Sequence, residues 1–103
     1  MTSIPIPSEP VRIALIGAGN RAQTEYAPLI SSLRPWAQLV AVCDPVKANC
    51  DAMAAKLGVP AIYDIRALVR DVAPQAALVV TPVESHHSIS IYLSSHCRSF
   101  LEP

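Results

Sequence analysis

Hydrophobic residues come in short, nearly uninterrupted runs, and these runs alternate with longer segments of helical spacing. Apolar runs of this length are typical of parallel strands that are covered on both faces. The runs predict strands at 11–16, 38–43, 61–63, 76–80 and 98–101. The segments between them predict helices at 20–33, 46–57, 65–72 and 85–95. Strands and helices therefore alternate along the whole chain.

Two of the predicted helices carry further detail. Pro28 lies inside the first and cannot donate a hydrogen bond to the preceding turn, so we expect a kink or two shorter pieces. In the second, Pro45 suits the start and Gly58 suits the position after the end. One face of this second helix is predicted to consist of Val46, Cys50, Met53, Ala54 and Leu57.

Alternating strands and helices joined by short turns define an α/β fold class. We predict a Rossmann-like, doubly wound parallel sheet with strand order 3-2-1-4-5. A complete dinucleotide-binding domain has six strands, so we expect this one to be truncated before its sixth strand and a second domain. Prolines mark 1–10 as a flexible Pro-rich leader, which places the dinucleotide-binding domain at 11–103.

Composition and charge narrow the range of functions. The chain has 103 residues, of which 51% are hydrophobic, and this content argues against disorder. Its formal net charge is zero and it has no basic patch, so nucleic acid is not an expected partner. No apolar run reaches membrane-spanning length, and we expect a cytoplasmic protein. The three cysteines are odd in number and lack a C-x-x-C pair, which predicts free thiols in a reducing compartment.

A G-x-G-x-x-A motif follows the first predicted strand and opens a helix. Gly17 permits a tight turn, Gly19 lets the backbone approach a pyrophosphate, and Ala22 allows close packing of helix on strand. Asn20 and Arg21 occupy the positions between; Arg21 either clamps a phosphate or, more commonly in such turns, faces solvent. The motif alone also fits an ordinary strand–turn–helix, so its context must decide.

An aspartate ends the second predicted strand, twenty-two residues after Ala22. The Asp44 carboxylate is placed to accept hydrogen bonds from both adenosine ribose hydroxyls and to repel a 2′-phosphate. Pro45 and Val46 follow it and offer no cation for such a phosphate, so NAD is favoured over NADP. The alternative is an aspartate that only begins a turn before a proline.

Other polar residues follow the fourth predicted strand. Thr81 and Pro82 either expose backbone carbonyls near a nicotinamide ribose or simply end the strand. His86 and His87 are adjacent, and neighbouring helical side chains point about 100° apart, so we do not predict a shared metal ion. No nucleophile–histidine arrangement can be assembled from the sequence, and the catalytic residues remain unknown.

Four segments together resemble a known family: 16–22, 41–45, 80–82 with His86 four residues on, and 101–103. In this order and spacing they resemble the N-terminal NAD(P)-binding domain of the Gfo/Idh/MocA (glucose–fructose oxidoreductase / inositol dehydrogenase) family. The resemblance implies hydride transfer between a nicotinamide cofactor and a sugar, polyol or related carbonyl or alcohol. Glu102 matches the glutamate of the family's Glu-Lys-Pro motif, and Pro103 stands at the lysine position. The candidate cofactor-binding residues are Gly17, Gly19, Asn20, Arg21, Asp44, Thr81, Pro82, His86 and Glu102.

In this family a longer C-terminal domain supplies the acid/base group and most substrate contacts. We therefore expect a sugar-like substrate to bind through that missing domain, and the full-length protein to form a homo-oligomer. Two alternatives stay open. Pro103 at the lysine position favours a non-catalytic, nucleotide-binding regulatory module. A truncated fragment without independent activity is the other.

Overall fold

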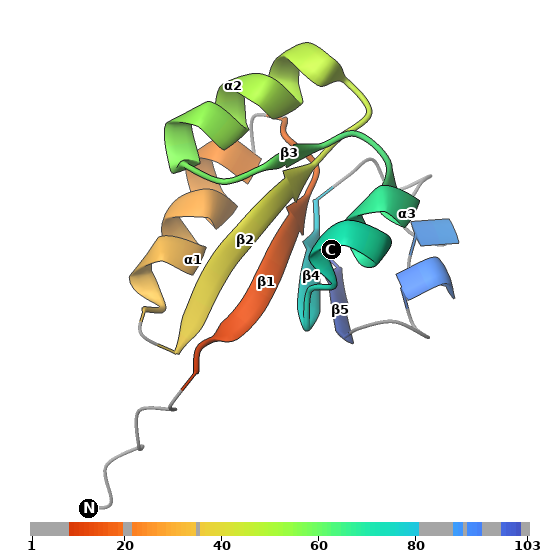
Figure 1. Cartoon of the computed structure of the whole chain (residues 1–103). Coiled ribbons are helices and arrows are strands. Elements are labelled where there is room, and N and C mark those ends of the chain that lie inside the picture. Colours follow the sequence, from red (N-terminus) through yellow and green to blue (C-terminus); the bar gives the residue numbers. More distant parts are fainter. Residues whose placement is uncertain are drawn as a thin grey trace, which may run out of the picture.

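One parallel sheet runs through the molecule, and helices cover both of its faces (Figure 1). The computed structural model describes residues 9–19, 22–34, 36–80, 88–89 and 91–93, and the backbone of 98–101. The elements are β1 (Val11–Ile16), η1 (Ala22–Tyr26, a π-helix), α1 (Ala27–Ser32), β2 (Ala37–Cys43), α2 (Lys47–Leu57), β3 (Ala61–Ile62), α3 (Ile65–Ala67), η2 (Leu68–Val72, a π-helix), β4 (Ala76–Val79) and β5 (Arg98–Leu101).

The strand order confirms the Rossmann-like topology. β1 lies between β2 and β4, and β3 pairs with the other side of β2, each pair being parallel. The predicted order 3-2-1-4 is therefore confirmed. The backbone of β5 runs parallel to the free side of β4. Parallel neighbours need crossover connections, and the helical segments between the strands provide them.

A bulge interrupts the pairing of β1 with β2. Ile13 pairs with Leu39, but the next residue of β1 pairs with Ala41, so Val40 is an extra residue on β2. A bulge of this kind bends its strand and increases the local twist. It also shifts every later pair by one residue, which sets the register of both strands where they end.

Both faces of the sheet are buried, as the uninterrupted apolar runs predicted. In β1, Leu15 packs on one face, whereas Ala14 and Ile16 pack on the other. The core between the sheet and η1, α1 and α2 consists of Leu15, Ala18, Ala22, Ala27, Ile30, Val42, Cys50, Met53 and Ala54. The core on the opposite side of the sheet consists of Ala14, Ile16, Ala41, Cys43, Leu68, Ala77, Val79 and Leu93.

The first helical segment consists of two pieces, as Pro28 predicted. The π-helix η1 ends at Tyr26, and α1 begins immediately afterwards with Pro28 in its first turn. A proline is tolerated there because the N–H it lacks would have no partner within the helix.

The predicted buried face of α2 is confirmed at Cys50, Met53 and Ala54. The prediction for Val46 is wrong, since this residue is 52% exposed. It has an extended backbone (φ −81°, ψ 98°) and precedes the helix, so helical spacing does not place its side chain. Gly58 ends α2 in a left-handed conformation (φ 70°), as its position suggested.

The third helical segment also divides, into α3 and η2, and ends at Ala73 with φ 49°. Arg12, the polar position of the first strand, binds this end. Its guanidinium donates to the carbonyl oxygens of Val72 (2.6 Å) and Ala73 (2.8 Å). Gln75 also exchanges hydrogen bonds with the Arg12 backbone, which ties β1 to the start of β4.

The last predicted helix is described only at 88–89 and 91–93, where the backbone is helical. Leu93 from this segment is fully buried and belongs to the second face of the core. Among the helices described, none is both long and apolar enough to cross a bilayer.

Candidate functional site

The loop that leaves β1 makes a tight turn at the carboxyl edge of the sheet. Gly17 has φ 111°, a conformation that glycine adopts without strain and L side chains rarely adopt. Its N–H donates to the carbonyl of Cys43 at 2.7 Å. Ala18 follows and is fully buried. The turn therefore has the conformation that the glycine motif suggested, and it lies directly against the end of β2.

The Asp44 carboxylate joins this turn to the start of α2. Its Oδ2 accepts a hydrogen bond from the Ala18 N–H at 2.7 Å, and its Oδ1 accepts one from the Val46 N–H at 2.8 Å. The contact exists because Ile16 pairs with Cys43 beyond the bulge, so both strands end at the same level. Each carboxylate oxygen keeps a further lone pair with which to accept a ligand hydroxyl.

Gly19 faces open space. A Cβ added there would meet no atom within 4 Å, so the packing of the described residues does not itself require glycine at this position. Space in front of a bare backbone suits the close approach of a ligand. The Gly19 carbonyl, in contrast, is used within the protein, because it accepts from the Gln23 N–H at 3.1 Å.

A cavity of about 230 Å³ lies beside Asp44, at the ends of β1, β2 and β3. Its lining is largely apolar: Ile16, Cys43, Pro45, Tyr63, Asp64, Ile65 and Ile89. The sequence did not indicate Tyr63 or Ile89 as part of this site. The position of Tyr63 directly after a strand was the signal available for it. Ile89 belongs to a distant helical segment and reaches the cavity only through the fold.

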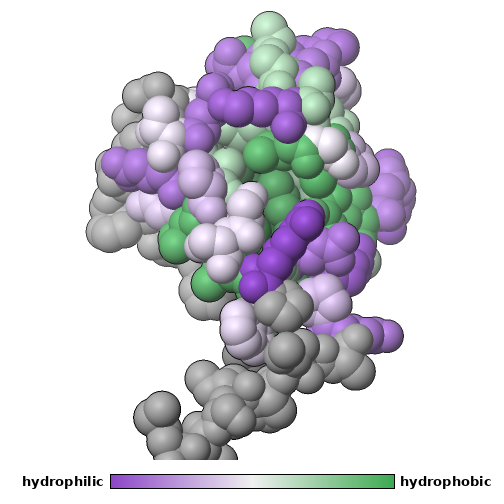
Figure 2. All heavy atoms as spheres, turned by 90° about the vertical axis from the view of Figure 1, so that its left-hand side faces the viewer, coloured by the Kyte–Doolittle hydropathy of each residue, from purple (hydrophilic) through white to green (hydrophobic). Residues whose placement is uncertain are grey.

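Among the described residues, two other cavities lie away from the carboxyl ends of the strands. One of about 480 Å³ involves Val11, Trp36 and Gln75, at the amino ends of β1, β2 and β4. The other, of about 230 Å³, is formed by helical side chains that include Pro28 and Met53. Figure 2 shows the helical face over α1 and α2, where hydrophobic residues gather between hydrophilic ones. Ligands of open α/β sheets bind at the carboxyl ends of strands, so the cavity beside Asp44 is the candidate site.

The described cysteines are free thiols and are buried, as predicted. Burial raises the pKa of Cys43 to about 12, with nearby acidic groups and Cys50 adding to the effect. Burial also raises the pKa of Cys50, whose Sγ lies 3.4 Å from the Val42 carbonyl and 3.3 Å from that of Ile62. Both thiols thus stay protonated and serve packing. Cys97 lies outside the described residues.

Several predicted site residues lie outside the described part of the chain: Asn20, Arg21, Thr81, Pro82, His86 and Glu102. Their roles stay predictions. Of the predicted site, the structure thus places Gly17, Gly19 and Asp44, and it brings all three to one edge of the sheet. Within the residues described, no three histidine, cysteine or acidic side chains gather to hold a metal ion.

A parallel sheet whose first glycine turn meets an acidic side chain at the end of β2 is the arrangement of a dinucleotide-binding Rossmann domain. The chain belongs to the Gfo/Idh/MocA oxidoreductase family. The family model, described as "Oxidoreductase family, NAD-binding Rossmann fold", matches residues 11–99. The resemblance found in the sequence is thereby confirmed.

The chain is also similar to individual proteins and solved structures. D-glucoside 3-dehydrogenase of Escherichia coli K12 is 32% identical over 97 residues, which are 92% of this chain and 27% of that protein. The WlbA dehydrogenase of Bordetella pertussis, solved with NADH and UDP-GlcNAcA, has a TM-score of 0.83 at 21% identity over 89% of this chain and 28% of its own. Biliverdin reductase of Synechocystis, solved with biliverdin and NADP+, has a TM-score of 0.78 at 28% identity over 91% of this chain and 29% of its own. The chain therefore spans less than a third of these relatives.

Proposed function

We propose that this chain forms the dinucleotide site of a longer NAD-dependent oxidoreductase. Its reaction would transfer a hydride between the nicotinamide and a carbon that bears a hydroxyl group in a sugar, a polyol or a related compound. Family membership supports oxidoreductase chemistry, and the relative acting on D-glucosides supports a sugar-like substrate. The rest of the protein would supply the acid/base group and bind the substrate, because the chain matches only 27% of that relative.

The position of Asp44 carries the proposal for the cofactor. Its carboxylate lies at the strand end with lone pairs left for the two hydroxyls of an adenosine ribose. A 2′-phosphate brought to the same place would meet like charge, which favours NAD over NADP. The apolar cavity walled by Tyr63 and Ile89 lies next to it and suits the flat adenine ring.

The glycine turn would hold the pyrophosphate. The open space at Gly19 admits close approach, and Gly17 with its positive φ makes the tight turn that precedes it. Thr81, Pro82, His86 and Glu102 are proposed to contact the nicotinamide half, with Asn20 and Arg21 beside the phosphates. Bound NAD supplies the hydride-accepting carbon. The protein residues position the cofactor and, in the complete enzyme, close the site against water.

Pro103 supports a second candidate function, a regulatory module that binds the nucleotide without chemistry. It stands where the family commonly has a lysine that is catalytic or orients the substrate. The two functions share the same cofactor site and differ in what the complete protein does with bound NAD. We propose the enzyme, acting as a cytoplasmic homo-oligomer, as the first candidate.

Two measurements test this. The 103-residue chain is titrated with NADH by calorimetry, with Asp44→Ala as the site variant and Asp71→Ala, an exposed aspartate outside the cavity, as the control. We expect weak NADH binding, its loss in Asp44→Ala, and no reduction of NAD by the chain alone. Unchanged binding by a folded Asp44→Ala chain would disprove the ribose assignment. The full-length protein is then mixed with NAD and a D-glucoside: NADH formation supports the enzyme, whereas binding without NADH formation supports the regulatory module.

A further inference from the structure

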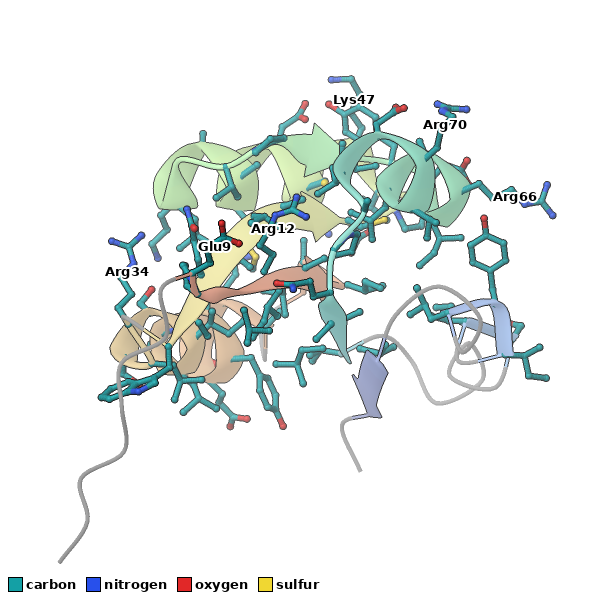
Figure 3. The ribbon with its side chains drawn as sticks, turned by 60° about the horizontal axis from the view of Figure 1, so that its bottom comes forward. Glu9, Arg12, Arg34, Lys47, Arg66 and Arg70 are labelled. Atoms are coloured by element: carbon teal, nitrogen blue, oxygen red, sulfur yellow. The ribbon has the colours of Figure 1, made fainter. Side chains whose placement is uncertain are left out.

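A cation follows the proposed ribose site, and two neighbouring side chains hold it. Lys47 is the first residue of α2, three positions after Asp44. Its Nζ donates to Oδ2 of Asp51 at 2.6 Å and lies 5.1 Å from the centre of the Tyr63 ring. The Tyr63 hydroxyl donates to Oδ1 of the same aspartate. We call Asp51 and Tyr63 the lysine clamp. Figure 3 shows the Lys47 side chain pointing outward from the molecule.

Helix geometry makes the direction of Lys47 informative. Side chains of an α-helix lean toward the helix N-terminus. For Lys47 that direction leads to the end of α2 where Asp44 accepts from the Val46 N–H. Its partner Asp51, however, lies four residues further along the helix. The clamp therefore fixes the ammonium against Asp51 and over the Tyr63 ring.

Helix stability does not account for this lysine. The helix dipole places partial positive charge at the N-terminus, where a cation is unfavourable. A basic residue four positions before an acidic one is also the weaker order for a helical ion pair. The pair is exposed, with 71% of the Lys47 and 42% of the Asp51 side chain accessible, and such pairs contribute little to folding.

The clamp is attached to the proposed cofactor site. Tyr63 lines the cavity beside Asp44 and, through its hydroxyl, fixes the carboxylate that holds Lys47. The contact with Asp51 raises the pKa of Lys47, and the lysine lowers the pKa of Asp51, so both groups stay charged at neutral pH. A cation three residues after Asp44 is what a 2′-phosphate would need if it were free to turn toward the ribose.

We propose that Asp51 and Tyr63 keep the Lys47 ammonium from the adenosine ribose and so strengthen the selection of NAD over NADP by Asp44. This inference rests on the proposed dinucleotide site. Asp51 and Tyr63 are positioning residues, because they act through Lys47. Asp44 repels the 2′-phosphate. Lys47 is the one cation in the segment 44–47, all of which the structure describes, and it could offset this repulsion. The clamp prevents this by holding Lys47 against Asp51.

A double-mutant cycle tests the clamp. NADH and NADPH dissociation constants are measured at low ionic strength for the parent chain, Asp51→Asn, Lys47→Met and the double variant. We expect Asp51→Asn to raise the affinity for NADPH relative to NADH about two- to five-fold, the range for exposed ion pairs. Lys47→Met alone should leave this ratio unchanged, and in the double variant it should abolish the gain.

Two further variants complete the design. Asp71→Asn breaks another exposed ion pair, that of Asp71 with Arg70 at 2.8 Å, and should not move the ratio. Tyr63→Phe keeps the ring but removes the hydroxyl, so it should shift the ratio in the same direction as Asp51→Asn, and it replaces that variant if Asp51→Asn does not fold.

The outcomes separate this inference from the proposed function. If the parent chain binds neither cofactor, the dinucleotide site is disproved and the inference with it. If NADH binds but the cofactor ratio is the same in Asp51→Asn or Tyr63→Phe as in the parent, only the clamp is disproved. Weaker NADPH binding by Lys47→Met in the parent background would also disprove it, because the lysine would then already reach the phosphate.

Discussion

Replacing Asp44 by alanine should destabilise the fold as well as the cofactor site. The carboxylate bonds the N–H groups of Ala18 and Val46, and these join the glycine turn to the start of α2. A hydrogen bond to a charged group contributes about 1.5–3 kcal/mol when partly buried, as at Ala18, and the exposed bond to Val46 adds about 0.5–1 kcal/mol. We therefore expect the free energy of unfolding to fall by about 2–4 kcal/mol.

Urea unfolding followed by circular dichroism measures this loss. Trp36 is the single tryptophan of the chain, and its fluorescence gives a second probe whose agreement supports a two-state transition. With a slope of about 2 kcal/mol per molar urea, the middle of the usual range, the midpoint should fall by about 1–2 M. Asp44→Asn should also lose stability, because its amide has one acceptor oxygen for two N–H donors.

Asp64 provides the control. It also follows a strand and precedes a helix, but it makes no side-chain hydrogen bond to that helix. Asp64→Ala should therefore change the free energy of unfolding by less than about 0.5 kcal/mol. An Asp44→Ala chain that unfolds at the midpoint of the parent would show that the carboxylate does not hold the turn, and it would remove the structural reason for its position.

Three further predictions concern the rest of the fold. Arg12→Met removes the hydrogen bonds to the carbonyl oxygens of Val72 and Ala73, and urea unfolding should show a loss of about 1–3 kcal/mol; no loss would mean that water replaces the guanidinium. Ala73→Gly relieves a left-handed alanine (φ 49°) and should raise the thermal midpoint by the equivalent of about 1 kcal/mol, whereas Ala67→Gly within α3 should lower it. Burial raises the pKa of Cys43 to about 12, above the usual thiol value of about 8.5 in the unfolded chain, so its contribution to stability is complete below that value and declines as the pH rises toward 12. Urea unfolding of the parent and Cys43→Ala between about pH 8 and pH 10 should show the steeper decline in the parent, and parallel profiles would contradict it.

Much of the fold could be predicted because its signals are local. Unbroken apolar runs marked strands buried on both faces, and the strand order 3-2-1-4 followed from their alternation with helices. Pro28 predicted a break in the first helical segment, and the structure has two pieces there, η1 and α1. The prediction failed at Val46, where an extended residue before the helix has no helical face. Helix boundaries depend on local backbone angles that spacing alone does not specify.

The candidate site depended more on tertiary structure. The glycine turn and Asp44 were visible in the sequence, but not the hydrogen bond between residues 26 positions apart. The sequence also did not predict that Arg12 binds the end of η2 or that Ile89 lines the cavity. Each of these contacts joins residues that are far apart along the chain, and composition and periodicity carry no information on such tertiary contacts.

The sequence by itself determined the class of domain and the turn at Gly17, because apolar periodicity and a left-handed glycine act within a few residues. Only the tertiary structure decided how the turn meets its aspartate. The extra residue Val40 on β2 shifts the register so that the ends of β1 and β2 coincide and the Ala18 N–H faces Asp44. The tertiary structure also placed Tyr63 where its hydroxyl donates to Asp51, the partner of Lys47. Register and side-chain pairing are decided by the packing of the whole sheet, and they determine what the site can bind.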